Sequence, residues 1–174
     1  MPYQTIIYEK QGALVDLTLN RPERLNAANL QLAREMHEAV GEIEADQEVR
    51  VVVLHGAGRA FCAGADIRAM SEGESSEVLG RNMSALCSRL EALSKVTIAA
   101  VHGYATGGGC EMALACDLRL AASGARFGLP EVKLGLLPGA GGTQRLTRIV
   151  GVGRAKMAMY TGDFVDAETA LQWG

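Results

Sequence analysis

Three consecutive glycines at 107–109 stand between an apolar run and a carboxylate, Glu111. The apolar run 96–101 predicts a buried strand, and the periodic apolar residues from Met112 onward predict a helix that starts directly after the glycines. Glycine permits positive φ and a close approach of the backbone to a ligand. The first turn of a helix leaves N–H groups without intrahelical partners, and these groups carry partial positive charge. The turn is therefore suited to an anionic oxygen that forms only in a transition state.

A second carboxylate, Glu131, follows twenty residues later in the Gly/Pro-framed loop Phe127-Gly-Leu-Pro-Glu131. Two carboxylates beside unpaired amides could act as an acid/base pair around a polarised carbonyl. The same residues would also fit a purely structural interpretation, in which the glycines only permit close packing and both glutamates are solvated. The rest of the chain must decide between these two interpretations.

A second glycine loop, Gly56 to Asp66, follows the run Val51-Val-Val-Leu54. That run predicts a strand over 49–55 that is buried on both faces, and a helical segment is predicted to begin at Ile67. The glycines at 56, 58 and 64 do not match a dinucleotide-binding fingerprint, because Phe61 occupies its third glycine position. Since each of the two loops ends at a helix start, one amide from each could converge on a single oxygen.

The segments before the first glycine loop predict a hairpin and a helix. The hairpin pairs 5–8 with 13–19, the polar loop 20–26 follows, and an amphipathic helix begins at Asn29. The apolar stripe of that helix consists of Leu32, Met36, Ala39, Val40 and Ile43, and its other faces carry Glu35, Glu38 and Glu42.

Later segments alternate between helices and short strands. Residues 71–80 are predicted to form a mobile surface loop, and Met83, Leu86, Leu90 and Leu93 mark a second amphipathic helix. A short strand over 117–122, a loop over 125–131 and helices over 143–149, 151–160 and from about 166 complete the chain, with Asp117 simply starting its strand. The glycines at 139–142 lack the lysine of a P-loop and are predicted to begin a helix. No interdomain linker interrupts this order, which predicts an α/β fold whose parallel strands need crossover helices.

Composition restricts the class of protein. The chain has 174 residues, of which 48% are hydrophobic and 21% charged, so it can build a core and disorder is not expected. A net charge of −3 and few aromatic residues argue against nucleic acid as the partner. No apolar run reaches membrane-spanning length, and Met1 to Thr5 does not resemble a signal peptide. We therefore expect a cytoplasmic protein with no membrane partner.

The cysteines and histidines show no metal-site spacing. Cys62, Cys87, Cys110 and Cys116 contain no C-x-x-C pair, so they are expected to be reduced and mostly buried, although counting alone leaves a disulfide possible. His37, His55 and His102 lack ligand partners nearby in the sequence and are interpreted as structural. No metal and no redox cofactor is predicted.

Four blocks stand out together: 60–67 (AFCAGADI), 102–111 (HGYATGGGCE), 127–135 (FGLPEVKLG) and 138–145 (PGAGGTQR). Taken together they resemble the crotonase (enoyl-CoA hydratase/isomerase) superfamily, and the opening 19–26 (LNRPERLN) is similar to the family's first loop. The blocks occur in order over essentially the whole chain. Glutamates at both 111 and 131 make the chain most similar to enoyl-CoA hydratases.

The resemblance implies a fold and a set of site residues. The fold is crotonase-like (ClpP/crotonase), a spiral of ββα units, here a single core domain over 1–174. In such a site the amides of Ala65 and Gly108 form the oxyanion hole, Glu111 orients and deprotonates water, and Glu131 protonates C2. The resemblance and the charges nearby suggest substrate or CoA contacts at Arg24, Leu25, Ala63, Ala65, Asp66, Ile67, Arg68, Gly107 and Pro130.

The implied reaction is reversible addition of water across the 2,3 double bond of a 2-trans-enoyl-CoA, in which coenzyme A is part of the substrate and no cofactor is needed. Each preorganised amide donor is typically worth ~3–4 kcal/mol of barrier. Two alternatives stay open: an enoyl-CoA isomerase or other acyl-CoA enzyme of this fold, and a non-catalytic acyl-CoA- or protein-binding module. Family members usually continue into C-terminal helices that build a homotrimer or hexamer. These helices are expected to be missing from the 174 residues, so the core domain is predicted to be truncated at its C-terminus and that assembly is not expected of this chain.

Overall fold

The computed structural model describes residues 3–174. The expectation about Met1 to Thr5, which do not resemble a signal peptide, therefore falls partly outside the described residues. Its main sheet has the order β1-β2-β3-β4-β6, in which only the hairpin pair β1–β2 is antiparallel. The strands are β1 (Ile6–Gln11), β2 (Leu14–Leu19), β3 (Val51–Gly56), β4 (Val96–Val101) and β6 (Leu118–Ala121). The predicted hairpin and the parallel arrangement of the later strands are thereby confirmed.

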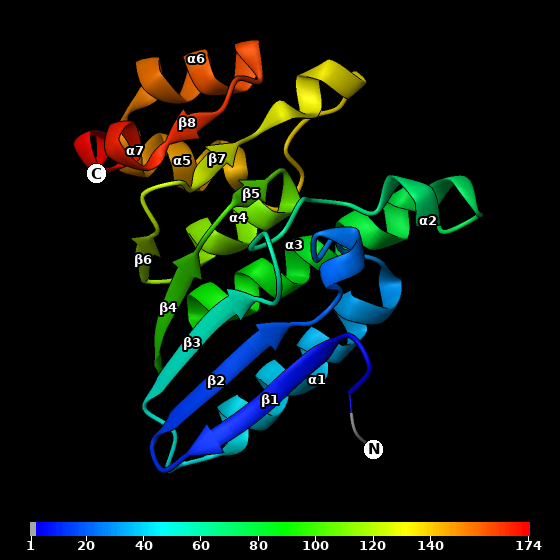
Figure 1. Ribbon diagram of the computed structural model, residues 1–174, viewed down its shortest axis with the longest axis vertical. Helices are drawn as coiled ribbons and strands as arrows, with labels where there is room; N and C mark the ends of the chain where they lie inside the picture. Colours follow the sequence, from blue (N-terminus) through cyan, green and yellow to red (C-terminus); the bar gives the residue numbers. More distant parts are fainter. Residues whose placement is uncertain (1–2) are drawn as a thin grey trace.

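A second, smaller sheet lies beside the first and consists of β5 (Tyr104–Thr106), β7 (Arg126–Gly128) and β8 (Val165–Asp166) (Figure 1). An isolated bridge joins Cys62 to Ala105 of β5. After each of β3, β4 and β6, the chain therefore contributes a segment to the second sheet and then enters a helix. This repetition is the spiral of ββα units that the family resemblance implied.

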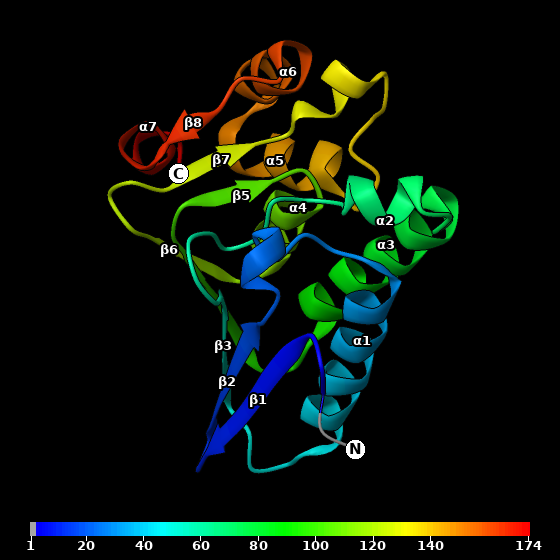
Figure 2. The same cartoon turned by 45° about the vertical axis from the view of Figure 1, so that its right-hand side comes forward.

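Two long helices, α1 (Leu30–Ala45) and α3 (Ser76–Ala92), cover one side of the main sheet (Figure 2). The shorter helices α4 (Gly108–Ala115), α5 (Gly142–Val150), α6 (Val152–Thr161) and α7 (Ala167–Trp173) gather around the second sheet. α2 (Ile67–Ser71) projects to the side, and two 3-10 turns, η1 (Pro22–Arg24) and η2 (Pro130–Leu134), complete the elements.

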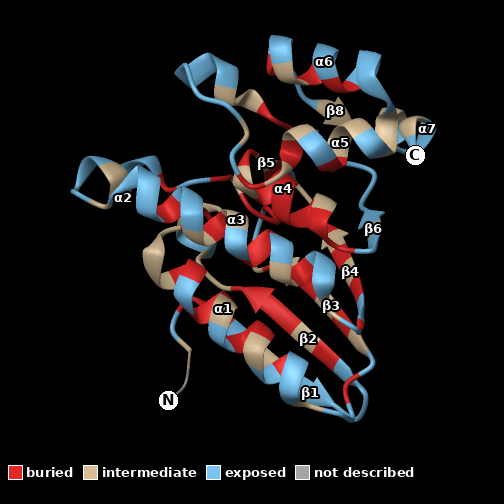
Figure 3. Ribbon diagram, turned by 180° about the vertical axis from the view of Figure 1, so that it is seen from behind, coloured by how far each residue is buried: buried red, intermediate tan, exposed pale blue. Residues whose placement is uncertain are grey.

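The predicted helix after Asn29 forms because its apolar residues share one face. Asn29 accepts the amide of Leu32 in the N-cap position, an interaction typically worth ~1 kcal/mol. The stripe predicted from the sequence is buried against the main sheet (Figure 3). Glu35, expected on a face other than the apolar stripe, is also buried, and its carboxylate accepts the backbone amide and the hydroxyl of Thr5.

The second amphipathic helix is also confirmed, and it is longer than predicted. α3 begins at Ser76 with Ser75 as its N-cap, so the predicted loop over 71–80 ends five residues earlier than expected. The N-cap and the exposed first turn of α3 lack the periodic apolar residues from which the helix was predicted. Its buried residues Met83, Leu86 and Leu90 join the same core as α1.

Three expectations about strands were wrong in detail. β3 buries alternate residues, so only one of its faces is fully covered. The segment 125–131 contains β7 and the start of η2, and β5 separates β4 from the glycines. These strands of three residues are too short to show a periodic pattern, and pairing with each other stabilises them. Asp117 also does more than precede β6, because its carboxylate accepts the amide and the hydroxyl of Thr97 in β4.

Candidate active site

The two glycine loops predicted to converge run side by side. The amide of Cys62 donates to the Tyr104 carbonyl, and the amide of Thr106 donates to the Cys62 carbonyl, each at 3.0 Å. Gly64 adopts a φ of +89°, and a Cβ added there would lie 2.9 Å from the Thr106 carbonyl oxygen. Only glycine permits this conformation and this approach. The backbone after β3 is thus placed against the start of α4.

Gly109, the third glycine of the run, allows the two loops to pack in direct backbone contact. A Cβ on Gly109 would lie 2.3 Å from the Cys62 carbonyl oxygen, whereas a Cβ on Gly108 would meet only the Met83 methyl group, at 3.8 Å. Gly107 has a φ of +53° and donates its amide to the Gly128 carbonyl. The three glycines therefore have different tasks: a turn at 107, a helix start at 108, and backbone packing at 109.

The amides of Ala65 and Gly108 both belong to these adjoining loops. Within residues 3–174 neither of the two N–H groups donates a hydrogen bond to the protein. Gly108 is the first residue of α4, where the N–H has no intrahelical partner and the helix dipole adds partial positive charge. The pair has the chemistry of an oxyanion hole.

Glu111 lies in the first turn of α4 and is almost completely buried, with 3% of its surface exposed. Its Oε1 accepts the amides of Ala140 at 2.7 Å and Gly142 at 2.8 Å. Burial raises the pKa of the carboxyl, while the Gly142 and Ala140 amides and the charge of Arg145 oppose that rise. These donors favour the ionised form, which is the form a general base needs.

Glu131 lies in η2, directly beside the glycine turn. A Cβ added to Gly107 would be 3.3 Å from Glu131 Oε1, so this carboxyl lies against the start of α4. Its Oε2 is buried and has no hydrogen-bond partner within residues 3–174. Burial, with a further contribution from the charge of Glu111, raises the pKa of Glu131 to about 7. The two carboxyls therefore differ: amides and Arg145 limit the rise in the pKa of Glu111, whereas burial raises the pKa of Glu131 to about 7.

Two residues that sequence analysis did not select hold the first loop in place. Arg21 is mostly buried and pairs with Asp66, the N-cap of α2, at 2.9 Å. Asn26 is fully buried and left-handed (φ 56°), and its Nδ2 donates to the carbonyls of Ala57 and Ala60. Its Oδ1 accepts the amide of Arg21. An asparagine in a polar loop was the available signal, because asparagine tolerates the left-handed region.

We expect Asn26→Ala to lower the free energy of unfolding by about 2–4 kcal/mol, because two carbonyls and one amide lose their buried partner. Denaturant unfolding measures this loss. Asn82→Ala is the matched control, since within residues 3–174 the Asn82 side chain bonds only the Val78 carbonyl of its own helix. The control should change stability by less than about 0.5 kcal/mol. Equal stability of the two variants would contradict the role assigned to Asn26.

The residues predicted for CoA contacts differ in how far they face solvent. Leu25 and Ala63 are hydrogen-bonded to each other through the backbone, and Ala65 and Ile67 are exposed on the same stretch of chain. Asp66 is buried by Arg21, so it positions α2 and does not face solvent. Pro130 begins η2 beside Glu131, and Gly107 contacts Glu131 as described.

The two arginines proposed for CoA contacts lie at exposed or half-exposed positions. Arg24 ends η1 and is half-buried. Arg68 is exposed and forms an i,i+4 pair with Glu72 at 2.9 Å. Such a pair is weak and screened by solvent, so it leaves the guanidinium available to another anion.

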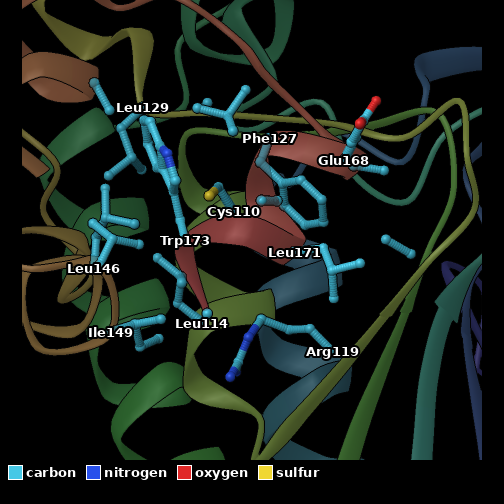
Figure 4. Close-up of a pocket in the computed structure, with 18 of the residues that line it drawn as sticks. Cys110, Leu114, Arg119, Phe127, Leu129, Leu146, Ile149, Glu168, Leu171 and Trp173 are labelled. Carbon is cyan, nitrogen blue, oxygen red and sulfur yellow. The ribbon is translucent and has the colours of Figure 1, made fainter. Parts of the chain in front are cut away.

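A cavity of about 760 Å³ includes neither Glu111 nor Glu131 in its lining (Figure 4). It lies behind α4, between β6, β7 and the helices α5 to α7, and its lining is mostly apolar. Residues that line it include Cys110, Leu114, Phe127, Leu129 and Trp173. This cavity is therefore separate from the carboxylate pair and the two free amides.

The remaining reactive side chains have structural partners. All four cysteines are free and buried, as predicted, and burial raises the pKa of Cys62 to about 11 and that of Cys110 to about 12. Each histidine lies within hydrogen-bond distance of a protein oxygen, from Asn82, Asp16 or Gly58. Within residues 3–174 no group of three His, Cys, Asp or Glu side chains could hold a metal ion. None of the helices in that range combines the length and apolar character needed to cross a membrane.

Known proteins resemble this chain over most of its length. The family model described as enoyl-CoA hydratase/isomerase matches residues 9–174. The chain belongs to the enoyl-CoA hydratase/isomerase family. The short-chain-enoyl-CoA hydratase of Clostridium acetobutylicum is 50% identical, and the match covers all of this chain and 68% of that protein. The crotonyl-CoA hydratase of Syntrophomonas wolfei is 45% identical with the same coverage.

Solved structures of the family share this fold. The crystal structure of the enoyl-CoA hydratase from Bacillus anthracis matches with a TM-score of 0.94 and 41% identity over 98% of this chain and 68% of its own. The corresponding structure from Geobacillus kaustophilus gives a TM-score of 0.90 and 44% identity over 100% and 68%. The crotonase-like fold implied by the sequence blocks is confirmed. The chain spans about two thirds of the length of these family members.

Proposed function

We propose that this chain catalyses the reversible addition of water across the 2,3 double bond of a 2-trans-enoyl-CoA to give a 3-hydroxyacyl-CoA. The observation that carries the proposal is the unequal pair of carboxyls beside two unpaired amides. Glu111 is held by the amides of Ala140 and Gly142, while Glu131 has an unpartnered oxygen and a pKa near 7. One general base, one general acid and an oxyanion hole are the groups that hydration of an enoyl thioester requires.

The reaction proceeds through an enolate. Glu111 takes a proton from water as the water oxygen bonds to C3, and the electron pair of the C2–C3 double bond moves toward the thioester. Negative charge then develops on the thioester oxygen, where the amides of Ala65 and Gly108 stabilise it. Glu131 donates its proton to C2, which completes the product. Glu111 ends protonated and Glu131 ionised, so a proton must return between them or through solvent before the next turnover.

The substrate partner in this proposal is an acyl-CoA, whose CoA part would lie over the first loop and residues 63–68. The exposed side of Ala65 and Ile67 and the half-buried Arg24 support that placement. The reaction moves only protons and water, so no redox cofactor takes part in it. Names of relatives that specify short-chain-enoyl-CoA and crotonyl-CoA hydratases support a short acyl chain.

The activity is tested by following loss of the conjugated thioester absorbance when the purified chain meets crotonyl-CoA. A 3-enoyl-CoA substrate supplies the isomerase arm of the same assay. Rapid loss with crotonyl-CoA supports hydration. Turnover of only the 3-enoyl substrate would assign an isomerase, and CoA binding by a folded chain without turnover of either substrate would assign a binding module.

The pH dependence of hydration should be bell-shaped, with its basic limb near pH 7. Hydration needs Glu131 protonated, and its pKa is raised to about 7, so kcat/KM should fall as pH rises through that value. The acidic limb reports protonation of Glu111, whose pKa burial raises while the amides of Gly142 and Ala140 oppose that rise. Initial rates over pH 5–9 measure both limbs. A rate that stays constant from pH 6 to 9 would exclude Glu131 as the proton donor.

A further inference from the structure

Arg145 is a buried cation that the chemistry described above does not use. It lies in the first turn of α5 with 7% of its surface exposed. A positive side chain in the first turn of a helix faces the positive end of the helix dipole, which is electrostatically unfavourable. Burying a cation there is costly unless specific partners compensate. The contacts of Arg145 should therefore show which partners compensate for this cost.

The guanidinium of Arg145 holds both the turn before its helix and a distant helix. Nη1 donates to the Ala140 carbonyl at 2.7 Å, and Nη2 pairs with Glu91 of α3 at 2.7 Å. The backbone amide of Ala140 donates in turn to Glu111 Oε1 at 2.7 Å. Ala140 thus accepts a hydrogen bond from Arg145 at its carbonyl and donates one to Glu111 from its amide.

The same turn contributes the second donor to Glu111. The amide of Gly142 lies 2.8 Å from Glu111 Oε1, and Gly141 between the two donors has a φ of +97°. A Cβ on Gly141 would lie 1.9 Å from Arg145 Nη1, so the guanidinium packs directly on the backbone of the turn. Nothing but glycine fits beneath the guanidinium in this arrangement.

We propose that Arg145 is a positioning residue for the base, Glu111. The ion pair with Glu91 holds the guanidinium in place, and the guanidinium fixes the 139–142 turn so that two amides of this turn point at one oxygen of Glu111. This inference rests on the proposed function, because it assigns Arg145 a task in the hydration step. The planar fork is essential, since it contacts the turn and α3 at once. A lysine would supply the charge at a single point only.

The charges around Glu111 define what removal of Arg145 should do. Arg145 of α5 is the cation that acts on it, Glu131 of η2 is the neighbouring carboxyl, and the thiols of Cys87 and Cys110 are neutral because burial raises their pKa. Loss of Arg145 removes the cation and loosens both amide donors. Both changes make Glu111 easier to protonate.

The test compares Arg145→Gln, Arg145→Lys and Glu91→Gln with Arg148→Gln. Arg148 is exposed on the same helix and forms no hydrogen bond or ion pair within residues 3–174, so it is the matched control. We expect Arg145→Gln to lower kcat for crotonyl-CoA about 10- to 100-fold with little change in KM, because misplacement of a catalytic group by about 1 Å has effects of that size. The acidic limb of its pH profile should move to higher pH. Arg145→Lys should keep the acidic limb close to that of the wild type and still lose rate.

A second readout does not depend on turnover. The carboxyl of Glu111, labelled with carbon-13 and assigned by its loss in Glu111→Gln, can be titrated by NMR in each variant. An upward shift of its pKa in Arg145→Gln and none in Arg148→Gln supports the inference. An unchanged Glu111 titration and rate in Arg145→Gln would overturn it, as would equal effects in the control.

The outcomes of the two proposals are distinguishable. If the wild-type chain does not turn over crotonyl-CoA, the proposed function fails, and the NMR titration still decides whether Arg145 governs Glu111. If Arg145→Gln does not fold, Glu91→Gln decides, because it removes the brace and leaves Arg145 in place. Wild-type rate and wild-type titration of Glu111 in folded Glu91→Gln would then overturn the positioning role.

Discussion

Glu131→Gln should lower kcat for hydration of crotonyl-CoA by about 10²–10⁴-fold, the usual contribution of a positioned general acid. The glutamine side chain occupies the same space but has no acidic proton for C2, so the loss should appear in kcat and leave KM almost unchanged. Glu111→Gln should cause a loss of similar size, because the attacking water then has no base. The basic limb of the pH profile should disappear in Glu131→Gln, since the group responsible for it is gone.

The control for this prediction is Glu38→Gln, which removes an exposed carboxylate on α1 far from the glycine loops. It should retain the wild-type rate. A Glu131→Gln variant that keeps more than about a tenth of the wild-type kcat would remove Glu131 from the mechanism.

Stability provides an activity-independent readout of the same variant. The pKa of Glu131 is about 7 in the folded chain, above its ordinary value of 4.5. Because the folded state binds this proton more tightly, the stability it contributes is complete below pH 4.5 and is lost as pH rises through about 7. Above pH 7 the folded wild type buries an ionised carboxylate, and the glutamine variant does not. Glu131→Gln should therefore be more stable than the wild type at pH 8 in denaturant unfolding, and the difference should vanish toward pH 4.5.

Gly108→Pro should lower kcat/KM by about 10²–10³-fold, because it deletes one N–H group of the oxyanion hole. Gly108 is the first residue of α4, a position where proline is well tolerated in helices, since its missing N–H would be unpaired there in any case. The fold should therefore survive, and the loss should come from the enolate that no longer finds its second donor. Steady-state kinetics with crotonyl-CoA and thermal unfolding measure the two effects separately.

Gly108→Ala is the matched control for this prediction. It retains the N–H, and its added Cβ would meet only the Met83 methyl group at 3.8 Å, an ordinary contact. We expect it to retain activity within about tenfold of the wild type, well above the proline variant. Equal losses in the alanine and proline variants would show that space at position 108, and not the amide, limits the rate.

Much of this protein follows from local sequence. The apolar stripes of α1 and α3 and the cap at Asn29 predict those helices, because a helix places residues three and four apart on one face. The glycine runs at 56–64 and 107–109 predict turns that approach one another, because only glycine permits positive φ without strain. Together with the two glutamates, these loops were enough to nominate the site and to indicate the family that the comparisons show.

Tertiary structure alone decided the rest. The strands β5, β7 and β8 have two or three residues each and form because a partner lies beside them, which no periodic pattern records. The burial of Glu35 and the buried pair of Arg21 and Asp66 depend on elements about 30 and 45 residues apart, and charged residues alone would be expected at the surface.

The division between the two glutamates has the same origin. The sequence places both Glu111 and Glu131 after the glycine turn, and only the family resemblance indicated which of them supplies a proton. Their surroundings differ because the turn 139–142, which Arg145 contacts, gives Glu111 two amides, while Glu131 Oε2 has no partner within residues 3–174. Burial raises the pKa of a carboxyl, and hydrogen-bond donors to its ionised form lower that pKa again. Residue type is fixed by sequence, whereas protonation depends on which groups the fold places around each carboxyl.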